Sequence, residues 1–286
     1  MRGMRESLVW RCREREIACG GRTLVMGIVN VTPDSFSDGG SFLDTASAVD
    51  HGARLAEEGA DVLDVGGEST RPGAAEVPVD DELERVVPVV EQLVKQIDVP
   101  VGVDTRKAEV ARRALDAGAA IVNDVTAGSD ADMFGVVRET GAGLVLMHMR
   151  GDPQTMQDDP RYDDVVTEVR DYLASRIGSA VAAGVPRAQL CVDPGIGFGK
   201  TLDHNLAILR AIASFRELRT PVLVGASRKR FIGQLTGVDD PADRIEGTAG
   251  AVAWCAAQGV DVVRVHDVLQ MRRVVNVVDA IAREAS

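Results

Sequence analysis

One pattern recurs eight times along the 286 residues of the chain. A short apolar run is followed by a polar loop and then by a stretch with the periodicity of an amphipathic helix. Strands are expected at residues 24–29, 61–65, 99–103, 119–122, 143–147, 189–192, 221–225 and 261–265. Helices are expected near 44–58, 80–96, 107–117, 130–140, 161–184, 203–214, 240–258 and 267–283. Eight strand–helix units predict a (β/α)8 barrel, the TIM-barrel form of the α/β class.

The main alternative with this element order is a doubly wound open sheet. Such sheets bind dinucleotides through a G-x-G-x-x-G turn after the first strand, and no such turn follows residues 24–29. No linker of disordered composition interrupts the chain, so residues 1–286 are expected to form one domain. Ahead of the first unit, residues 1–21 form an arm in which Leu8-Val9-Trp10 and Ile17-Ala18-Cys19 predict a short hairpin, with Gly20-Gly21 as the turn signal.

Composition excludes some classes of partner. A formal net charge of −12 argues against nucleic acid, although local basic loops still permit a small anionic substrate. No apolar run reaches membrane-spanning length, and residues 1–22 lack the apolar core of a signal peptide. The four cysteines show neither metal-ligand spacing nor a paired framework, so we expect reduced thiols in the cytoplasm.

Polar residues gather at the expected strand ends, where the active site of a (β/α)8 barrel lies. They are Asn30, Asp64, Asp104, Asn123, His148, Asp193, Ser227, Arg228, Lys229, Arg230, Arg264 and His266, with the apolar Met147 directly before His148. One polar residue after an apolar run is common at any strand end. Helix N-capping alone does not readily explain why so many polar residues converge on one end of the barrel. The sequence therefore predicts a ligand site there.

Two carboxylates and an amide in that set, Asp104, Asp193 and Asn123, require hydrogen-bond donors if they are half buried. A flat heterocycle with several ring N–H and NH2 groups would satisfy them edge-on. The alternative for each aspartate singly is a helix N-cap.

The basic residues in the set suggest anion binding. Ser227-Arg228-Lys229-Arg230 is expected to open a helix, with Arg264 and His266 one strand further on. Helix N-termini beside Arg or Lys bind anions, and the loops after strands seven and eight are the usual phosphate site of such barrels. The alternatives are a solvated basic turn and an ordinary rim histidine. Gly195, Gly197 and Gly199 resemble a phosphate loop, which is a weak signal alone.

Two polar, glycine-containing loops at residues 30–41 and 66–79 look able to close over a ligand and exclude water. Zinc-type ligand sets are absent, whereas Asn30 with nearby acids suits Mg2+ held through a phosphate. Neither a Ser-His-Asp set nor a nucleophilic cysteine is evident. These features together favour binding a heterocycle and a diphosphate, and a transfer reaction in which diphosphate leaves.

At these residues the chain resembles the dihydropteroate synthase family of folate biosynthesis. The matching stretches are MGIVNVTPDSFSDGG (26–40), DVGGESTRPG (64–73), VDT (103–105), ND (123–124), DPGIGFGK (193–200), GASRK (225–229) and RVHDV (264–268). The likeness spans about residues 22–285. It implies a transferase that joins 6-hydroxymethyl-7,8-dihydropterin diphosphate to 4-aminobenzoate, giving 7,8-dihydropteroate and diphosphate.

The resemblance also implies residue roles. The pterin ring would be held by Asp104, Asn123, Asp193 and Lys229, with Asp64 and Met147 lining that pocket. The diphosphate would be bound by Asn30, Arg71, Arg264 and His266, with Asn30 acting through Mg2+ as the metal ligand. The catalytic set would be Arg71, Lys229, Arg264 and His266.

For the second substrate, the resemblance implies that 4-aminobenzoate is bound by Thr70, Pro72, Phe198, Ser227 and Lys229, with Ser227 meeting its carboxylate at a helix N-terminus. Phe36 and Asp38 would lie on the loop that closes over this site. An arylamine is already a free nucleophile at neutral pH, so no strong general base is required.

Two other activities compete with this one. A pterin-dependent methyltransferase on the same barrel would keep the pterin acids, and a non-catalytic pterin-binding paralogue would be expected to lose parts of the second site. The family also implies a homodimer. The apolar faces of the last helices, with Val274, Val275, Val277, Val278 and Ile281, would form its interface or simply cover the barrel.

Overall fold

A computed structural model describes residues 7–31, 41–69, 73–152 and 155–282 of the chain. Its main sheet contains parallel strands in the order β8-β7-β6-β5-β4-β3-β10-β9. These strands are β3 (Leu24–Asn30), β4 (Val62–Gly66), β5 (Val101–Asp104), β6 (Ile121–Asp124), β7 (Gly143–Met147), β8 (Leu190–Asp193), β9 (Leu223–Val224) and β10 (Val262–Val265). The sheet curls round until β9 approaches β8, where Val192 forms a parallel bridge with Val222 and donates to the carbonyl of Pro221 at 2.9 Å. The predicted (β/α)8 barrel is confirmed in this nearly closed form.

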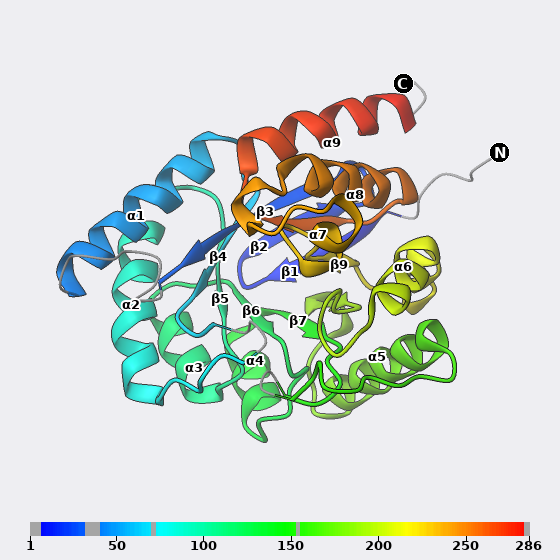
Figure 1. Ribbon diagram of the computed structural model, residues 1–286. Coiled ribbons are helices and arrows are strands. Elements are labelled where there is room, and N and C mark those ends of the chain that lie inside the picture. The colour runs from blue at the N-terminus through cyan, green and yellow to red at the C-terminus, as the bar shows by residue number, and fades with distance from the viewer. Residues whose placement is uncertain (1–6, 32–40, 70–72, 153–154, 283–286) are drawn as a thin grey trace.

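Helices surround the strands, as Figure 1 shows. They are α1 (Ser41–Glu57), α2 (Val79–Gln96), α3 (Ala108–Asp116), α4 (Met133–Thr140), α5 (Val165–Ala182), α6 (Leu202–Arg210), α7 (Arg230–Thr236), α8 (Ile245–Gln258) and α9 (Val268–Ala282). Alternation along β3 divides its side chains between two cores. Val25 and Val29 join the large core between strands and helices, whereas Leu24 and Met26 join the barrel interior.

The N-terminal hairpin closes the amino end of the barrel. Strands β1 (Leu8–Cys12) and β2 (Arg15–Cys19) pair antiparallel. Trp10 is fully buried in the same cluster as Val62 and Ile121, which lie near the starts of β4 and β6. Its indole Nε1 donates to the carbonyl of Gln189 at 2.9 Å. The hairpin therefore acts as a plug whose indole fills the end of the barrel opposite the predicted site.

The hairpin itself is confirmed, and the chain bends at Gly20-Gly21 after its second strand, where Gly20 has a left-handed φ of 88°. The chain reverses at Arg13-Glu14, where Arg13 has a left-handed φ of 58°. Its guanidinium Nη1 donates to the carbonyls of Leu115 and Ala119 at 2.8 and 3.0 Å. These long-range contacts stabilise a conformation that a non-glycine residue rarely adopts, so no local sequence signal marks the turn.

Three expected helices differ from those observed. The expected helix 240–258 is α8, which begins only at Ile245. A 3-10 turn at Pro241–Asp243 precedes it. The expected helix 203–214 is α6, which ends at Arg210 and is followed by a 3-10 segment, Ile212–Leu218. The expected helix 161–184 begins at Val165, because the side chain of Asp164 accepts from the amides of Val166 and Thr167.

No helix in the described parts of the chain is both long and apolar enough to cross a bilayer. That residues 1–286 form a single domain stays a prediction.

We expect Trp10→Ala to lower the free energy of unfolding by about 3–5 kcal/mol, because it leaves a cavity where the hairpin seals the barrel. Denaturant unfolding measures this change. Val9 is the matched control, since it lies on the same strand with an exposed side chain, and its change to alanine is expected to stay within about 0.5 kcal/mol. Equal losses for the two variants would show that the hairpin is not a plug.

Candidate active site

Arg264 is the centre of a buried polar network at the carboxyl ends of the strands. Its Nε donates to Oδ2 of Asp64 at 2.6 Å, and its Nη2 donates to Oδ2 of Asp104 at 2.7 Å. Nδ2 of Asn123 donates to the same Oδ2 of Asp64 at 2.9 Å. Buried carboxylates require a cation or hydrogen bonds in compensation. The structure therefore gathers three of the residues expected around a pterin: Arg264 bonds to both aspartates, and Asn123 joins them through Asp64.

The strand register explains how these side chains meet. Asp64 lies opposite Gly102 on β5, and Gly66 lies opposite Asp104. A Cβ atom at Gly102 would stand 3.2 Å from Oδ1 of Asp64, which is tighter than ordinary packing. Glycine at this position therefore permits the inward carboxylate.

Two of the carboxyl groups titrate near neutral pH. Burial raises the pKa of Asp104 to about 7, against the opposing charge of Arg264 and with a further rise from Asp64. Burial also raises the pKa of Asp193 to about 6, although the amide of Gly195 and the ammonium of Lys229 oppose it. A ligand edge that donates hydrogen bonds to these groups would favour their ionised form.

An apolar wall stands beside the carboxylates. Met147, Val125, Met156 and Phe198 form a small buried cluster. Nζ of Lys229 lies 3.9 Å from the centroid of the Phe198 ring, a cation–π contact. The predicted site residues Met147, Phe198 and Lys229 are thus brought together between the ends of β7, β8 and β9.

The glycine series after β8 does not present a phosphate cradle. The amide of Gly195 donates to Oδ1 of Asp193 at 2.7 Å, and the amide of Gly197 donates to Oδ1 of Asn205 at 2.7 Å. The amide of Phe198 donates to the carbonyl of Gly195. With these amides committed inside the protein, the resemblance of the series to a phosphate loop is misleading.

Ser227 and His266 form a pair at the ends of β9 and β10. The backbone amide of His266 donates to Oγ of Ser227 at 3.2 Å, and this Oγ lies 3.0 Å from Nδ1 of the imidazole. A hydroxyl that accepts from the amide can still either donate to Nδ1 or accept from it, and we assign the arrangement in which the Ser227 hydroxyl donates to Nδ1. That assignment leaves the hydrogen of a neutral imidazole on Nε2, as a donor.

The charge state of His266 follows from its surroundings. Burial, with the nearby cations Arg228 and Arg264, lowers the pKa of His266 to about 3. At neutral pH it therefore offers a hydrogen-bond donor to an anion and not a positive charge. The expectation that Ser227 lies at a helix N-terminus is wrong, because α7 begins at Arg230 and Lys229 precedes it as the cap residue.

Arg228 holds the turn between Ser227 and Lys229 in a left-handed conformation, with φ 58°. Its guanidinium forms a two-point pair with Asp267, at 3.0 and 2.6 Å. Its amide donates to Oγ1 of Thr248 at 3.0 Å, and its carbonyl accepts from Nη1 of Arg244 at 3.0 Å. Sequence reasoning missed Thr248, in α8, and Arg244, which directly precedes α8. No local sequence pattern indicates that these residues support a loop about 20 positions earlier in the chain.

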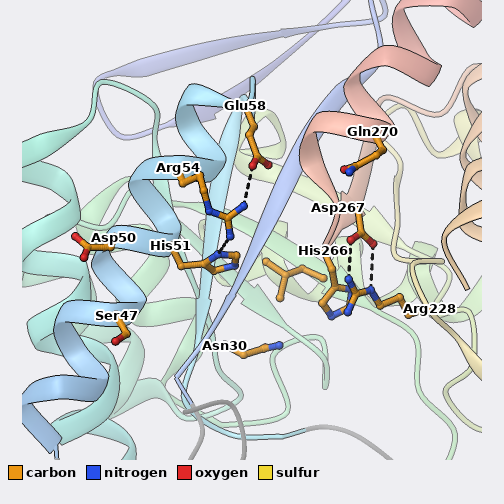
Figure 2. Close-up of a pocket in the computed structure, with 11 residues that line it drawn as sticks. Asn30, Ser47, Asp50, His51, Arg54, Glu58, Arg228, His266, Asp267 and Gln270 are labelled. Atoms are coloured by element: carbon orange, nitrogen blue, oxygen red, sulfur yellow. Dashed lines mark hydrogen bonds and ion pairs between the residues drawn. The ribbon is translucent and has the colours of Figure 1, made fainter. Parts of the chain in front are cut away.

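A polar groove of about 660 Å³ opens beside this turn, between α1 and α9. Figure 2 shows Asn30 and His266 at its base, with His51, Arg54 and Glu58 on the α1 side and Asp267 and Gln270 on the α9 side. Asn30, at the end of β3, is partly exposed. The groove therefore adjoins two of the residues expected to bind diphosphate.

Several expected site residues lie outside the described residues: Thr70, Arg71, Pro72, Phe36 and Asp38. The base of the 66–79 loop is described. Glu68 accepts from the amide of Val77 at 3.1 Å and from Nζ of Lys107 at 3.1 Å, and Lys107 also donates to the carbonyl of Val77 at 2.7 Å. These contacts hold residues 68 and 77 together.

Within the described part of the chain, no three His, Cys, Asp or Glu side chains are grouped as a metal site. Asn30 supplies one amide oxygen at the groove base. Mg2+ commonly takes few protein ligands and completes its shell with substrate oxygens and water. The residues present therefore fit a Mg2+ ion that is carried in by a diphosphate.

We expect His266 to remain neutral between about pH 5 and 8, whereas an ordinary histidine titrates there. This follows from the lowered pKa of His266, because the charged imidazolium forms only on strong acidification. Nitrogen NMR of labelled imidazoles tests the charge and the tautomer together, with Nδ1 unprotonated in the native chain. Ser227→Ala is expected to mix the tautomers. A titration midpoint near that of free histidine would contradict the assignment.

Comparison with known proteins agrees with this geometry. The family model "Pterin binding enzyme" matches residues 26–266. Dihydropteroate synthase of Escherichia coli K12 is 47% identical over 256 residues, covering 90% of each chain. The structure of Xanthomonas albilineans dihydropteroate synthase with 4-aminobenzoic acid superposes with a TM-score of 0.92 at 47% identity, covering 98% of this chain and 100% of that one. The same enzyme with 7,8-dihydropteroate gives 0.84 at 46% identity, covering 92% and 95%. The chain belongs to the pterin-binding enzymes and, among them, to the dihydropteroate synthase family.

Proposed function

We propose that this chain condenses 6-hydroxymethyl-7,8-dihydropterin diphosphate with 4-aminobenzoate, releasing diphosphate. The observation that carries the proposal is the juxtaposition of buried acceptors with a ring-binding wall. Asp104 and Asp193 are buried carboxylates at the carboxyl ends of β5 and β8, which β6 and β7 separate in the sheet. Lys229, whose Nζ lies over the Phe198 ring, is the ammonium near Asp193. The solved relatives with 4-aminobenzoic acid and with 7,8-dihydropteroate support the same pair of ligands.

In this proposal the pterin ring lies in the carboxylate pocket. Its ring N–H and NH2 donors pair with Asp104, Asn123 and Asp193, while Lys229 contacts an acceptor of the ring. Asp64 stays paired to Arg264 and lines the pocket with Met147. The electron-rich ring stabilises positive charge at the exocyclic methylene, so the bond from this carbon to the diphosphate oxygen breaks early.

The departing diphosphate is received by Arg264, His266 and Asn30, with Arg71 from the adjacent loop. Arg264 uses Nε and Nη2 for the two aspartates, which leaves the hydrogens of Nη1 to bind the anion in this proposal. His266 adds its Nε2 hydrogen. Preorganised donors at the site of developing charge are usually a large contribution to catalysis. Mg2+ bound to the diphosphate through Asn30 would supply further charge neutralisation.

The second substrate is proposed to contact Phe198, Lys229 and Ser227, with Thr70, Pro72 and Phe36 completing the site. After the carbon–oxygen bond has broken, the amine nitrogen attacks the methylene carbon and then loses a proton to solvent. No strong base is needed, because the amine is uncharged at neutral pH. Holding both reactants in position can contribute about 7–11 kcal/mol in favourable cases.

Diphosphate release from the purified chain tests this function. We expect release that requires 4-aminobenzoate and Mg2+ together, with 7,8-dihydropteroate formed in equal amount. Lys229→Met is expected to reduce turnover at least about 100-fold, because it removes a charge that faces both ring sites. The matched control is Lys95→Met on the exposed face of α2. Tight pterin binding without condensation would indicate a non-catalytic pterin-binding paralogue. Methyl transfer from a pterin would indicate a pterin-dependent methyltransferase.

A homodimer is part of the proposal, at a surface different from the one first expected. On α9, Val275 is fully buried and covers the barrel, while Val277 and Ile281 are exposed. A more continuous apolar surface is the groove of about 260 Å³ between α6, α7 and α8, where Leu235 and Trp254 are exposed. Exposed apolar grooves of this kind commonly mark association sites.

Sedimentation tests the dimer. We expect a mass near twice 30.4 kDa, with Trp254→Asp shifting the chain to monomer because it places a charge in the interface. Val277→Asp on α9 is the control and should leave the dimer intact. If only the α9 variant dissociates the dimer, the interface lies on α9 instead.

A cytoplasmic location is also proposed. It is supported by the four cysteines, which are all free, buried thiols: Cys12, Cys19, Cys191 and Cys255.

A further inference from the structure

The loop that carries Phe198 is fixed by side chains from several elements. Nε2 of Gln157 donates to the carbonyl of Gly197 at 2.7 Å. Nζ of Lys200 donates to the carbonyl of Phe198 at 2.9 Å, and the hydroxyl of Tyr162 donates to the carbonyl of Gly199 at 2.8 Å. Three consecutive carbonyls are thus each held by a different side chain. A loop built from glycines on both sides of Phe198 has little stiffness of its own, so these donors determine where the ring lies.

Lys200 is the buried member of this set, with only 3% of its surface exposed. Besides the Phe198 carbonyl, its Nζ lies 2.9 Å from Nδ1 of His148 and 3.4 Å from the His148 carbonyl. An ammonium has three hydrogens, and these three acceptors use them all. His148 directly follows β7, so the amine ties the end of that strand to the loop after β8.

The surroundings explain why an amine is tolerated there. Burial lowers the pKa of Lys200 to about 7, while Asp193 opposes the fall and Lys229 and Arg150 add to it. Burial, followed by the charge of Lys200, lowers the pKa of His148 to about 3. A neutral imidazole can accept from the ammonium at Nδ1, or donate from Nδ1 to the uncharged amine. The tie therefore survives the loss of the lysine proton.

The loop delivers Phe198 to the second substrate's site. The ring is almost buried, at 8% exposure, against Met147 and Met156 on one side. Nζ of Lys229 lies over the ring. The Cβ of any side chain at Gly199 would fall 2.5 Å from the carbonyl of Arg150, so the backbone next to Phe198 has no room to shift in that direction.

We propose that Lys200 is a positioning residue for the 4-aminobenzoate site, because its buried amine ties the Phe198 carbonyl to the end of β7 and so sets the ring against Lys229. This inference rests on the proposed function. Lys200 reaches neither substrate, since its three hydrogens are directed into the protein. Its effect should therefore fall on the affinity for the ring that Phe198 contacts, and much less on the pterin.

Lys200→Met tests the inference, because methionine fills similar space without donors. We expect the KM for 4-aminobenzoate to rise about tenfold, as losing buried hydrogen bonds to the loop implies. The KM for the pterin diphosphate should rise clearly less than this, because Lys200 acts on Asp193 only through its charge and its hydrogen bonds go to His148 and Phe198. Equilibrium dialysis with 4-aminobenzoate, diphosphate and Mg2+ gives a second readout that needs no turnover, and its Kd should rise by the same factor. Lys95→Met is again the surface control.

Two outcomes would overturn the inference: both KM values unchanged, or both raised equally, which would indicate general damage to the fold. If Lys200→Met does not fold, Tyr162→Phe removes the donor to the next carbonyl and should raise the 4-aminobenzoate KM about threefold with the pterin KM unchanged. A native chain that binds 4-aminobenzoate but releases no diphosphate would reject the proposed reaction, and the Kd comparison alone would then decide the role of Lys200.

Discussion

The contact of Arg264 with Asp64 and Asp104 is the interaction on which the rest of the site depends. Two carboxylates, Asp64 and Asp104, and the amide of Asn123 lie buried on the successive strands β4, β5 and β6, and an uncompensated buried charge costs several kcal/mol. One guanidinium, reaching both acids at 2.6 and 2.7 Å, offsets that cost. The cation is itself supplied by β10, the strand beside β3, so closing the barrel assembles the site. In the proposed reaction, Arg264 therefore contacts both the aspartates of the pterin pocket and the departing diphosphate.

The loops around this centre are fixed from outside the site. Thr248, Arg244 and Asp267 hold the left-handed turn at Arg228, so Ser227 faces His266 while Lys229 faces Phe198. Gln157, Lys200 and Tyr162 hold the glycine loop on the other side. A reaction that uses no strong base depends on placing two rings and a leaving group accurately, and these supports provide that placement before either substrate arrives.

The sequence was sufficient for the barrel and for the gathering of the described strand-end residues at its mouth, because apolar periodicity and strand-end polarity are local signals. It was insufficient wherever a distant partner decides the local structure. The turn at Arg13 depends on the carbonyls of Leu115 and Ala119, and the helix start at Arg230 depends on the turn that Thr248 stabilises. For the same reason, no local signal showed that Arg264, expected at the diphosphate, pairs with Asp64 and Asp104, expected at the pterin.

Proton release when the pterin binds tests the central claim most directly. Asp104 and Asp193 have pKa values raised to about 7 and about 6, and ring donors favour their ionised forms. Titrating 6-hydroxymethyl-7,8-dihydropterin near pH 6.5 by calorimetry, in two buffers of different ionisation enthalpy, counts the protons exchanged. Our account predicts net proton release and an affinity that weakens as pH falls. Proton uptake, or binding with no exchange across this range, would show that the pterin is not held by these carboxylates.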